Sequence, residues 1–455
     1  MRVSSLPPGP GAAWKEAFSQ AVPALPDSDL LAQIFLEERE DLRVVVEDGA
    51  VGDIVRTRTR GLSARTRARF LYRSNPDPDD ALRLVRAIST TGPELSRAAN
   101  PRPPVPSPSD PVPHVVRILQ RLTQRAARGN PARALASWVS FGQHVLIGRP
   151  GLGLHTDARS ARRVRLEVRI DRRGAHAVAV GERVLPAAAD EVLDDLAAEV
   201  VRRAEERLDA RPAPGGDTAV VFSPGVGGIL LHEIVGHALE SDTVLAGASA
   251  LAASAAAIAH PEVTVVDDPR RGRASWRIDD EGEEARATML VQGGRIAGWI
   301  SDLRRAARSG RPPTGHGRRA NYHQPVLPRM GCTFLAPGRL DADEILRQTG
   351  TGILVRRMEA AAADPSAGTA VFRVTDADRI HRGAVNEPLA PFLLRANAPQ
   401  ALESLDRIAD DLLFDTCIGS CVRDGQPLAT SVGAPTFRIG VAAVVSSESE
   451  WRQGG

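Results

Sequence analysis

Two histidines and one glutamate lie within six residues, in the segment His232-Glu233-Ile234-Val235-Gly236-His237. Neutral imidazole nitrogens are common zinc ligands, and a carboxylate beside the ion can take a proton from water that the ion acidifies. The segment is therefore a candidate zinc centre, with Glu233 as the base that helps water to attack a peptide carbonyl. On spacing alone, a helix whose two histidines bind no metal explains the same residues equally well.

The spacing of the two histidines constrains the helix that carries them. They are five residues apart, whereas a regular α-helix aims two ligands at one ion from positions four apart. Five steps of about 100° turn the second side chain about 140° away from the first. One extra residue in a widened turn would restore convergence, and Gly236 would tolerate that distortion. The sequence predicts a bulged or interrupted helix at Val235-Gly236.

A catalytic zinc ion also needs a third protein ligand and an open fourth position. Cys421 lies in a turn-rich stretch, residues 419 to 426, where a thiolate can be presented to a metal. Cys417 and Cys421 could instead form a separate metal or redox pair, but the chain has no second pair of cysteines to complete a structural zinc site. The residues by themselves leave several candidates open: Cys332, Cys417, Cys421, His316, His323 and His381.

The histidine segment is expected in the second of two domains of an α+β protein. A change towards short β-like runs and glycine turns places the boundary near residue 215, between an N-terminal α+β domain (1–215) and a C-terminal catalytic domain (216–455). The C-terminal domain is expected to be mainly antiparallel β around one helix that opens from the turn at residues 223–228. Its predicted strands are 218–222, 263–267, 287–292, 295–301, 369–375 and 436–445.

The N-terminal region mixes helical and strand patterns. Residues 28–41 predict a helix, and 43–55 predict a hairpin with its turn at Asp48-Gly49. A proline-rich stretch, about residues 100–113, predicts an exposed connector. Helices are expected at 115–128 and 190–207. The arginine-rich stretch 158–173 alternates apolar and basic residues, which favours a strand with a solvated basic face over a surface for an acidic partner.

Composition excludes several classes of protein. A formal net charge of +2 and an aromatic content of 4% give no footprint for nucleic-acid binding. We find no apolar run long enough to cross a bilayer and no signal-peptide pattern, so no membrane association is expected. Three cysteines confined to the last third of the chain argue against a disulfide framework. These features predict a cytoplasmic protein.

Several motifs together resemble the TldD/PmbA family of metallopeptidases, in particular its metal-bearing TldD-type branch. The similarity follows the family order through residues 218 to 440 and is looser in the N-terminal half. The matching segments are HEIVGH with the following Ala238-Leu239-Glu240-Ser241-Asp242, then VVDDP, Arg277 to Gly282, Pro313 to Arg319, Pro328-Arg329-Met330, and Cys421 before an Asp-Gly-Gln turn.

The resemblance implies a zinc ion held by His232, His237 and Cys421, with Glu233 as the catalytic base. It leaves Cys332 as a structural residue and assigns no role to Cys417. Val422-Arg423 departs from the usual Gly-Lys after the cysteine. Arg318 and Arg319 are candidate substrate-binding residues, since arginine can bind peptide carbonyls or a terminal carboxylate. The segment Asp279-Asp280-Glu281 could line the same site or form a tight turn.

The resemblance also implies partners and a substrate. Family members pair as a homodimer or as a heterodimer with a PmbA-like chain, around a cavity that admits small or unfolded peptides. The peptide lies as an extended strand against a sheet edge. Maturation of a peptide precursor is one such use. The alternative is a non-catalytic partner subunit of a heterodimeric protease, which the intact set of candidate ligands disfavours.

Overall fold

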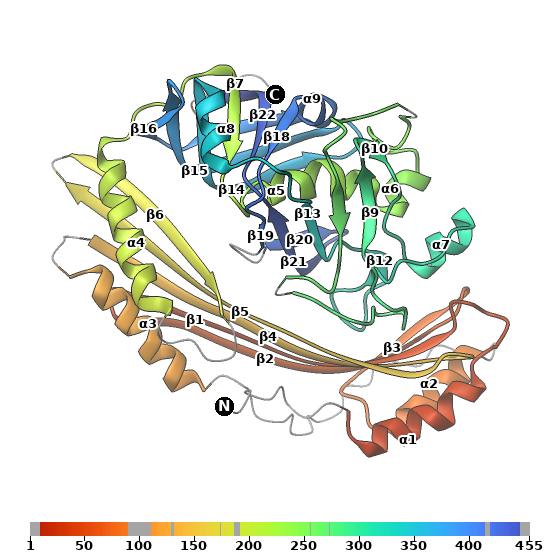
Figure 1. The fold of residues 1–455 in the computed structure, drawn as a ribbon. Helices are drawn as coiled ribbons and strands as arrows, with labels where there is room; N and C mark the ends of the chain where they lie inside the picture. Colours follow the sequence, from red (N-terminus) through yellow and green to blue (C-terminus); the bar gives the residue numbers. More distant parts are fainter. Residues whose placement is uncertain are drawn as a thin grey trace.

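The N-terminal half of the chain builds one long, curved antiparallel sheet (Figure 1). The computed structural model describes residues 10–89, 111–128, 132–172, 174–185, 192–254, 256–272, 274–414 and 419–445. The six strands of this sheet are, in spatial order, β3 (Phe70–Ser74), β2 (Ala50–Arg65), β1 (Gln33–Glu47), β4 (Ala132–Arg149), β5 (Gly153–Arg172) and β6 (Ala175–Val184).

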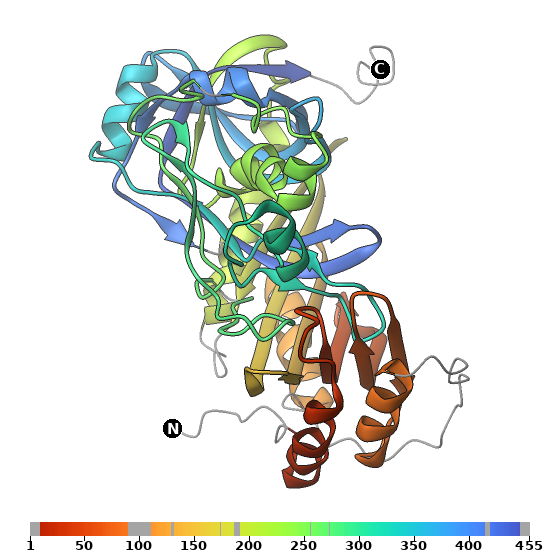
Figure 2. The same cartoon turned by 90° about the vertical axis from the view of Figure 1, so that its right-hand side faces the viewer.

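Helices cover the two ends of this sheet on one face (Figures 1 and 2). At one end, Phe18 and Leu84 pack on Ile34 and Leu36 of β1; at the other, Leu119 packs against the apolar residues of β1, β4 and β5. The helices are α1 (Ala12–Ala21), α2 (Asp79–Ser89), α3 (Val112–Ala126) and α4 (Val192–Glu206). The two latter helices confirm the predictions for 115–128 and 190–207.

The helix predicted at residues 28–41 is wrong, because this stretch forms most of the central strand β1. Both faces of β1 are covered: Ile34 and Leu36 face the helices, while Phe35 packs with Tyr322 from the C-terminal half. Glu37 is fully buried and accepts hydrogen bonds from Gln143 Nε2 (2.6 Å) and the backbone N–H of Tyr322 (2.8 Å). A charged residue at a buried strand position therefore depends on distant partners.

The hairpin turn predicted at Asp48-Gly49 is confirmed, with both residues at positive φ between β1 and β2. Most of the expected connector at 100–113 lies outside the described residues. Its last part is helical, since α3 begins at Val112 with Pro113 in its first turn, where a missing N–H costs nothing. No helix within the described ranges is long and apolar enough to span a membrane.

The C-terminal half forms two seven-stranded sheets. One contains β10 (Arg295–Ile296), β9 (Thr288–Gln292), β8 (Val265–Asp267), β13 (Cys332–Leu335), β21 (Gln426–Ala434) and β19 (Leu413–Phe414), with β20 (Gly419–Arg423) paired to β21. The other contains β14 (Gly352–Asp364), β7 (Gly216–Phe222), β22 (Phe437–Val445), β17 (Phe392–Asn397), β15 (Thr369–His381) and β16 (Ala384–Leu389), with β18 (Leu405–Ile408) paired to β22.

These sheets confirm the mainly antiparallel C-terminal half, because only the pairings β13–β21 and β14–β7 among the described strands are parallel. The strand expected at 295–301 is shorter than predicted and ends at Ile296. The division into independent domains at residue 215 stays a prediction. The remaining elements are β11 (Gly317–Arg318), β12 (Leu327–Pro328), α5 (Gly228–Leu231), α6 (Ser241–Leu245), α7 (Leu303–Ser309), α8 (Ala342–Thr349) and α9 (Ala398–Glu403).

Candidate metal centre

The histidine-bearing helix lies between the two C-terminal sheets. Its apolar residues Leu230, Leu231, Ile234 and Val235 belong to one buried cluster with residues of both sheets. The chain reaches it from β7 through a turn in which Gly225 has a φ of +82°. A helix with apolar residues around most of its circumference is stable only when it is covered on several sides. The two sheets therefore hold the histidine segment in place.

The helix is irregular where the histidines require it. Residues His232–Gly236 form a π-helix, which follows α5 and precedes a 3₁₀ turn at His237–Leu239. A π turn contains one more residue than an α turn, so side chains five apart can converge. The distortion predicted at Val235-Gly236 is confirmed.

Gly236 is needed for a different reason from the expected one. Its backbone is right-handed helical, with φ −56° and ψ −59°, so no unusual conformation demands glycine. A Cβ atom at this position would fall well inside the van der Waals radius of Met330 Sδ. Glycine is therefore required by the close approach of Met330 to the helix.

We expect Gly236→Ala to lower the free energy of unfolding by about 1–3 kcal/mol, the usual cost of overpacking a core. Met330 or the helix must move, and the two histidines would separate. Urea unfolding and a zinc-binding titration measure the two effects. Gly52→Ala is the control, because this glycine is exposed in β2 and a Cβ atom there comes no closer than 3.5 Å to another atom. Equal stability and zinc affinity of the two variants would contradict the packing argument.

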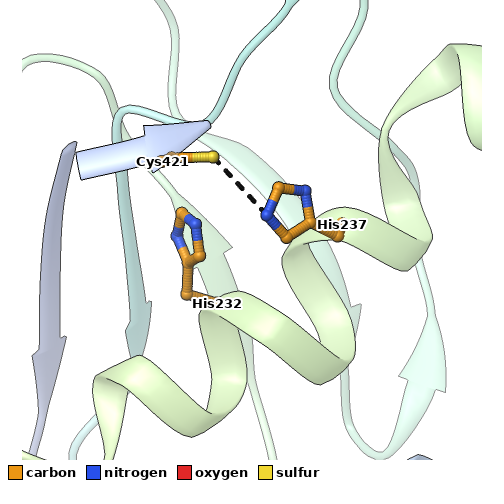
Figure 3. Close-up of side chains that lie close together, drawn as sticks. All are labelled: His232, His237 and Cys421. Atoms are coloured by element: carbon orange, nitrogen blue, oxygen red, sulfur yellow. Dashed lines mark hydrogen bonds between the residues drawn. The ribbon is translucent and has the colours of Figure 1, made fainter. Parts of the chain in front are cut away.

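His232, His237 and Cys421 come together at the surface of this helix (Figure 3). One ligand atom from each side chain lies within 4.8 Å of the other two, and Cys421 Sγ is 3.5 Å from His237 Nε2. Two donors of a tetrahedral zinc ion are about 3.5 Å apart when the bonds are about 2.0–2.3 Å. Two imidazoles and one thiolate also match the three-ligand zinc sites that keep a fourth position open. The residues fit zinc.

Burial favours the neutral form of His232. It holds the pKa of His232 well below its usual value, and the positive charges of His237 and Arg329 add to the effect. The buried His232 Nδ1 has no hydrogen-bond partner among the described residues. His237 Nδ1 donates to the Glu240 carboxylate (3.1 Å), which leaves Nε2 facing Cys421 with a free lone pair. Both rings can thus offer a neutral nitrogen to a cation.

The Cys421 thiol lies in an environment that favours ionisation. Burial opposes it, but the hydrogen bond to His237 and the positive charges of His237 and Arg329 outweigh burial and lower the pKa of the thiol. Cys421 sits on β20, which forms a hairpin with β21 and carries the thiol to the helix. A thiolate, and not a thiol, is the form that binds a metal.

Glu233 lies beside the cluster without completing it. Its Oε2 is 3.7 Å from His237 Nε2, and its side chain is 15% exposed. Burial raises its pKa, and the nearby His237 offsets only part of that increase. A carboxyl group with a raised pKa, near the candidate ligands yet still reachable by water, can accept and return a proton.

Two residues near the site had no role in the sequence prediction. Glu240 is fully buried and lies between His237 and Arg423, with which it forms an ion pair. Arg423 Nη2 also reaches Asp242 (2.9 Å) and Thr243 Oγ1 (3.0 Å). Carboxylates that hold a ligating histidine are a common feature of zinc sites. The signal in the sequence is Glu240 three residues after His237, in the extended position between the 3₁₀ turn and α6.

The other candidate third ligands lie elsewhere. His316 is buried and contacts Asp267 (3.0 Å) through Nε2, and His323 lies against Tyr72 and Tyr322. Cys332 is buried in β13, as expected of a structural residue. His381 ends β15 and does not join the cluster. Cys417 lies outside the described residues.

Arg318 and Arg319 are buried, and this burial argues against direct contact with a peptide. Arg318 lies over the ring of Trp276 and Arg319 over that of Phe35. Asp280 accepts a hydrogen bond from the Arg318 side chain (3.3 Å) and another from the backbone N–H of Arg319 (2.8 Å). Burial raises the pKa of Asp280, but the positive charges of Arg159, Arg318 and Arg319 outweigh burial and hold this pKa at about 2. These residues join the C-terminal half to the long sheet.

The segment 279–281 belongs to the same buried interface. Asp280 Oδ1 accepts from Arg159 Nη1 (2.6 Å), and Glu281 pairs with Arg65. Arg65 and Arg159 lie on β2 and β5 of the long sheet. The sequence does not distinguish a tight turn from a substrate site at residues 279–281, because the arginines that bind this segment are more than 100 residues away in the chain.

Comparison with known proteins agrees with these features. Residues 215–446, about half of the chain, match the family model described as the PmbA/TldA metallopeptidase C-terminal domain. A "Metalloprotease" of Methanothermobacter thermautotrophicus is 32% identical over 256 residues, which cover 56% of each chain. A "Metalloprotease TldD homolog" of Haemophilus influenzae is 32% identical over 53% of this chain and 51% of its own. A "Zinc metalloprotease TldD homolog" of Saccharolobus solfataricus is 27% identical over 54% and 56%.

The matched region spans about half the length of these curated relatives. Solved structures share the fold over almost the whole chain. TldE from Thermococcus kodakarensis superposes with a TM-score of 0.72 at 16% identity, covering 95% of this chain and 100% of its own. A candidate modulator of a DNA gyrase from Thermotoga maritima superposes with a TM-score of 0.73 at 14% identity, covering 91% and 96%.

Proposed function

The chain belongs to the PmbA/TldD family of metallopeptidases, and on that premise we propose that it is a zinc-dependent peptidase whose ion is held by His232, His237 and Cys421. The observation that carries the proposal is the convergence of these three side chains within 4.8 Å, with the Glu233 carboxylate beside them. The neutral imidazole of His232, the Nε2 atom of His237 that faces Cys421, and a thiol with a lowered pKa suit a cation.

When bound, zinc acidifies a water molecule and polarises a carbonyl group, which makes hydrolysis possible at neutral pH. Glu233 accepts the proton of the attacking water and returns it to the leaving amine. Glu240 keeps His237 oriented by accepting a hydrogen bond from its Nδ1–H group, and the ion pair with Arg423 fixes Glu240 in turn. The raised pKa of Glu233 allows the same carboxyl group to act as base and then as acid.

We propose small or unfolded peptides as substrates, including peptide precursors. Strand β20 pairs with β21 on one side and, among the described strands, with none on the other. The exposed residues Ser420 and Val422 flank Cys421 on this strand. A peptide in extended form can add to such an edge through backbone hydrogen bonds, and this brings its carbonyl groups close to the candidate ligands.

A second chain is part of the proposal. TldE, whose structure shares this fold, supports a PmbA-like partner, and a homodimer is the other possibility. We propose a dimer whose cavity excludes folded proteins. The cytoplasmic location expected from the composition stays a prediction.

Removal of the metal is the direct test of the proposed function. We expect the purified protein to contain one zinc ion per chain, to lose cleavage of an unstructured peptide after dialysis against a chelator, and to regain it when zinc is restored. Metal analysis and mass spectrometry of the products measure both results, with and without a PmbA-like chain. Cleavage that survives complete removal of the ion would overturn the proposal.

A further inference from the structure

Arg329 is a buried arginine that touches the strand of the candidate cysteine ligand. It is 1% exposed. Its Nη2 donates to the backbone carbonyl of Cys421 (2.6 Å), and its Nη1 donates to that of Gln426 (2.9 Å). These two carbonyls belong to the two strands of the β20–β21 hairpin. One rigid guanidinium group therefore spans the hairpin that carries Cys421.

Burying the positive charge of Arg329 costs free energy, because the guanidinium group loses its contact with water. In the part of the chain that the structure describes, Arg329 forms no ion pair with a carboxylate, and its Nε has no hydrogen-bond partner. Buried cations are normally paired, as Arg318 is with Asp280. Its guanidinium group instead lies against the carbonyls of Cys421 and Gln426, which places its positive charge on the hairpin that carries the candidate cysteine ligand.

The residue after Arg329 contacts the other half of the site. Met330 Sδ occupies the space beside Gly236 in the π-helix between the two histidines. The segment is itself anchored, because Arg329 N donates to the His316 carbonyl (2.9 Å) and Gly331 N donates to Asp267 Oδ1 (2.9 Å). Adjacent residues thus bind the cysteine hairpin and the histidine helix to one fixed segment.

We propose that Arg329 is a positioning residue of the metal centre, which holds the β20–β21 hairpin at a set distance from the histidine helix and provides a fixed positive charge beside the sulfur. This inference rests on the proposed role of His232, His237 and Cys421 as ligands. Because Arg329 is buried, it acts through Cys421 and not on the substrate. Substitution of Arg329 should therefore weaken zinc binding even in the absence of a peptide.

The test compares Arg329→Gln and Arg329→Lys with the parent protein. Glutamine removes both the positive charge and the planar guanidinium group that binds two carbonyls at once. Lysine keeps the charge but cannot bind both carbonyls with one planar group. We expect Arg329→Gln to bind zinc about 10–100-fold more weakly, the usual effect of losing a residue that supports a ligand. Arg329→Lys should lie between Arg329→Gln and the parent. Chelator competition measures zinc affinity, and the sulfur-to-cobalt charge-transfer absorption of the Co²⁺ form reports whether Cys421 is bound.

Arg207→Gln is the matched control. Arg207 is also buried and also donates to a backbone carbonyl, that of Val178 (3.1 Å), and its partner Asp376 keeps a second cation in Arg203. We expect this variant to lose stability in urea with the zinc affinity of the parent. The metal-free forms of all variants are unfolded in parallel, which separates loss of stability from loss of affinity.

The outcomes are distinct. Parental zinc affinity and cobalt absorption in Arg329→Gln would overturn this inference alone. A parent protein without the sulfur-to-cobalt absorption would overturn the proposed metal site and this inference with it. If Arg329→Gln does not fold, Arg329→Lys decides: weaker zinc binding at unchanged stability supports the positioning role, and parental affinity overturns it.

Discussion

Glu233→Gln is expected to retain zinc and to lose about 10²–10⁴-fold in kcat/KM for an unstructured peptide, the range that a positioned acid–base group contributes. Glutamine has nearly the same shape but cannot accept a proton from water. Glu233 is not one of the three converging ligands, so the metal content should stay at the parental level. Metal analysis and steady-state kinetics on the same preparation measure both halves of this prediction.

Glu403→Gln is the matched control for that variant. Glu403 ends α9, is exposed, and lies on a helix that contributes no residue to the metal centre. It should keep the parental kcat/KM and zinc content. A Glu233→Gln protein with full zinc and undiminished cleavage would show that another group moves the proton.

Cys421→Ala is expected to lower zinc affinity by more than about 100-fold. Substitution of a residue that only supports a ligand already lowers metal affinity by about 10–100-fold, and loss of a ligand should lower it further. The variant keeps the two histidines but loses the anionic donor, and a two-nitrogen site holds zinc weakly. Chelator competition measures the affinity. Peptide cleavage should fall in parallel at zinc concentrations that saturate the parent protein.

Cys332→Ala separates loss of a ligand from loss of a buried thiol. Cys332 is fully buried in β13 and packs with Val266 and Phe334 away from the cluster. We expect it to lose some stability in urea and to bind zinc as the parent does. If Cys421→Ala also binds zinc as tightly as the parent, Cys421 is not the third ligand.

The two variants also distinguish an enzyme from a non-catalytic subunit. A chain that binds zinc through Cys421 yet cleaves no peptide, with or without a PmbA-like chain, would be a partner subunit that keeps its metal for structure. If the parent cleaves the peptide and Glu233→Gln does not under the same conditions, the chain is itself an enzyme. The peptide assay with added partner is therefore part of both measurements.

The errors in the fold prediction have a common cause. The helices at Val112–Ala126 and Val192–Glu206 follow from local periodicity, because their apolar residues recur every three or four positions. The helix predicted at residues 28–41 is wrong because Glu37 and its charged neighbours are atypical of a central strand. Glu37 is accommodated there by Gln143 and Tyr322, which are 106 and 285 residues away.

The same limit applies to Arg318 and Arg319. A pair of arginines near a candidate site is typical of a substrate-binding segment. The neighbouring residues give no indication that the pair is buried. The partners that bury it, Asp280 and the ring of Phe35, come from other parts of the chain. Charge and motif predict chemistry, but exposure is decided by packing.

The spacing of His232 and His237 is enough to show that the two side chains cannot share an ion on a regular helix, and hence that the helix must be distorted near Gly236. This is a matter of backbone geometry within six residues. The residues alone leave three cysteines and three histidines as candidates for the third ligand, and the family resemblance selects Cys421. Only the tertiary structure brings Cys421 within 3.5 Å of His237, 184 residues away, and adds Glu240, Arg423 and Arg329 around them. Contacts of that span depend on how β20 and β21 pair and where the sheets hold the helix, which no local pattern encodes.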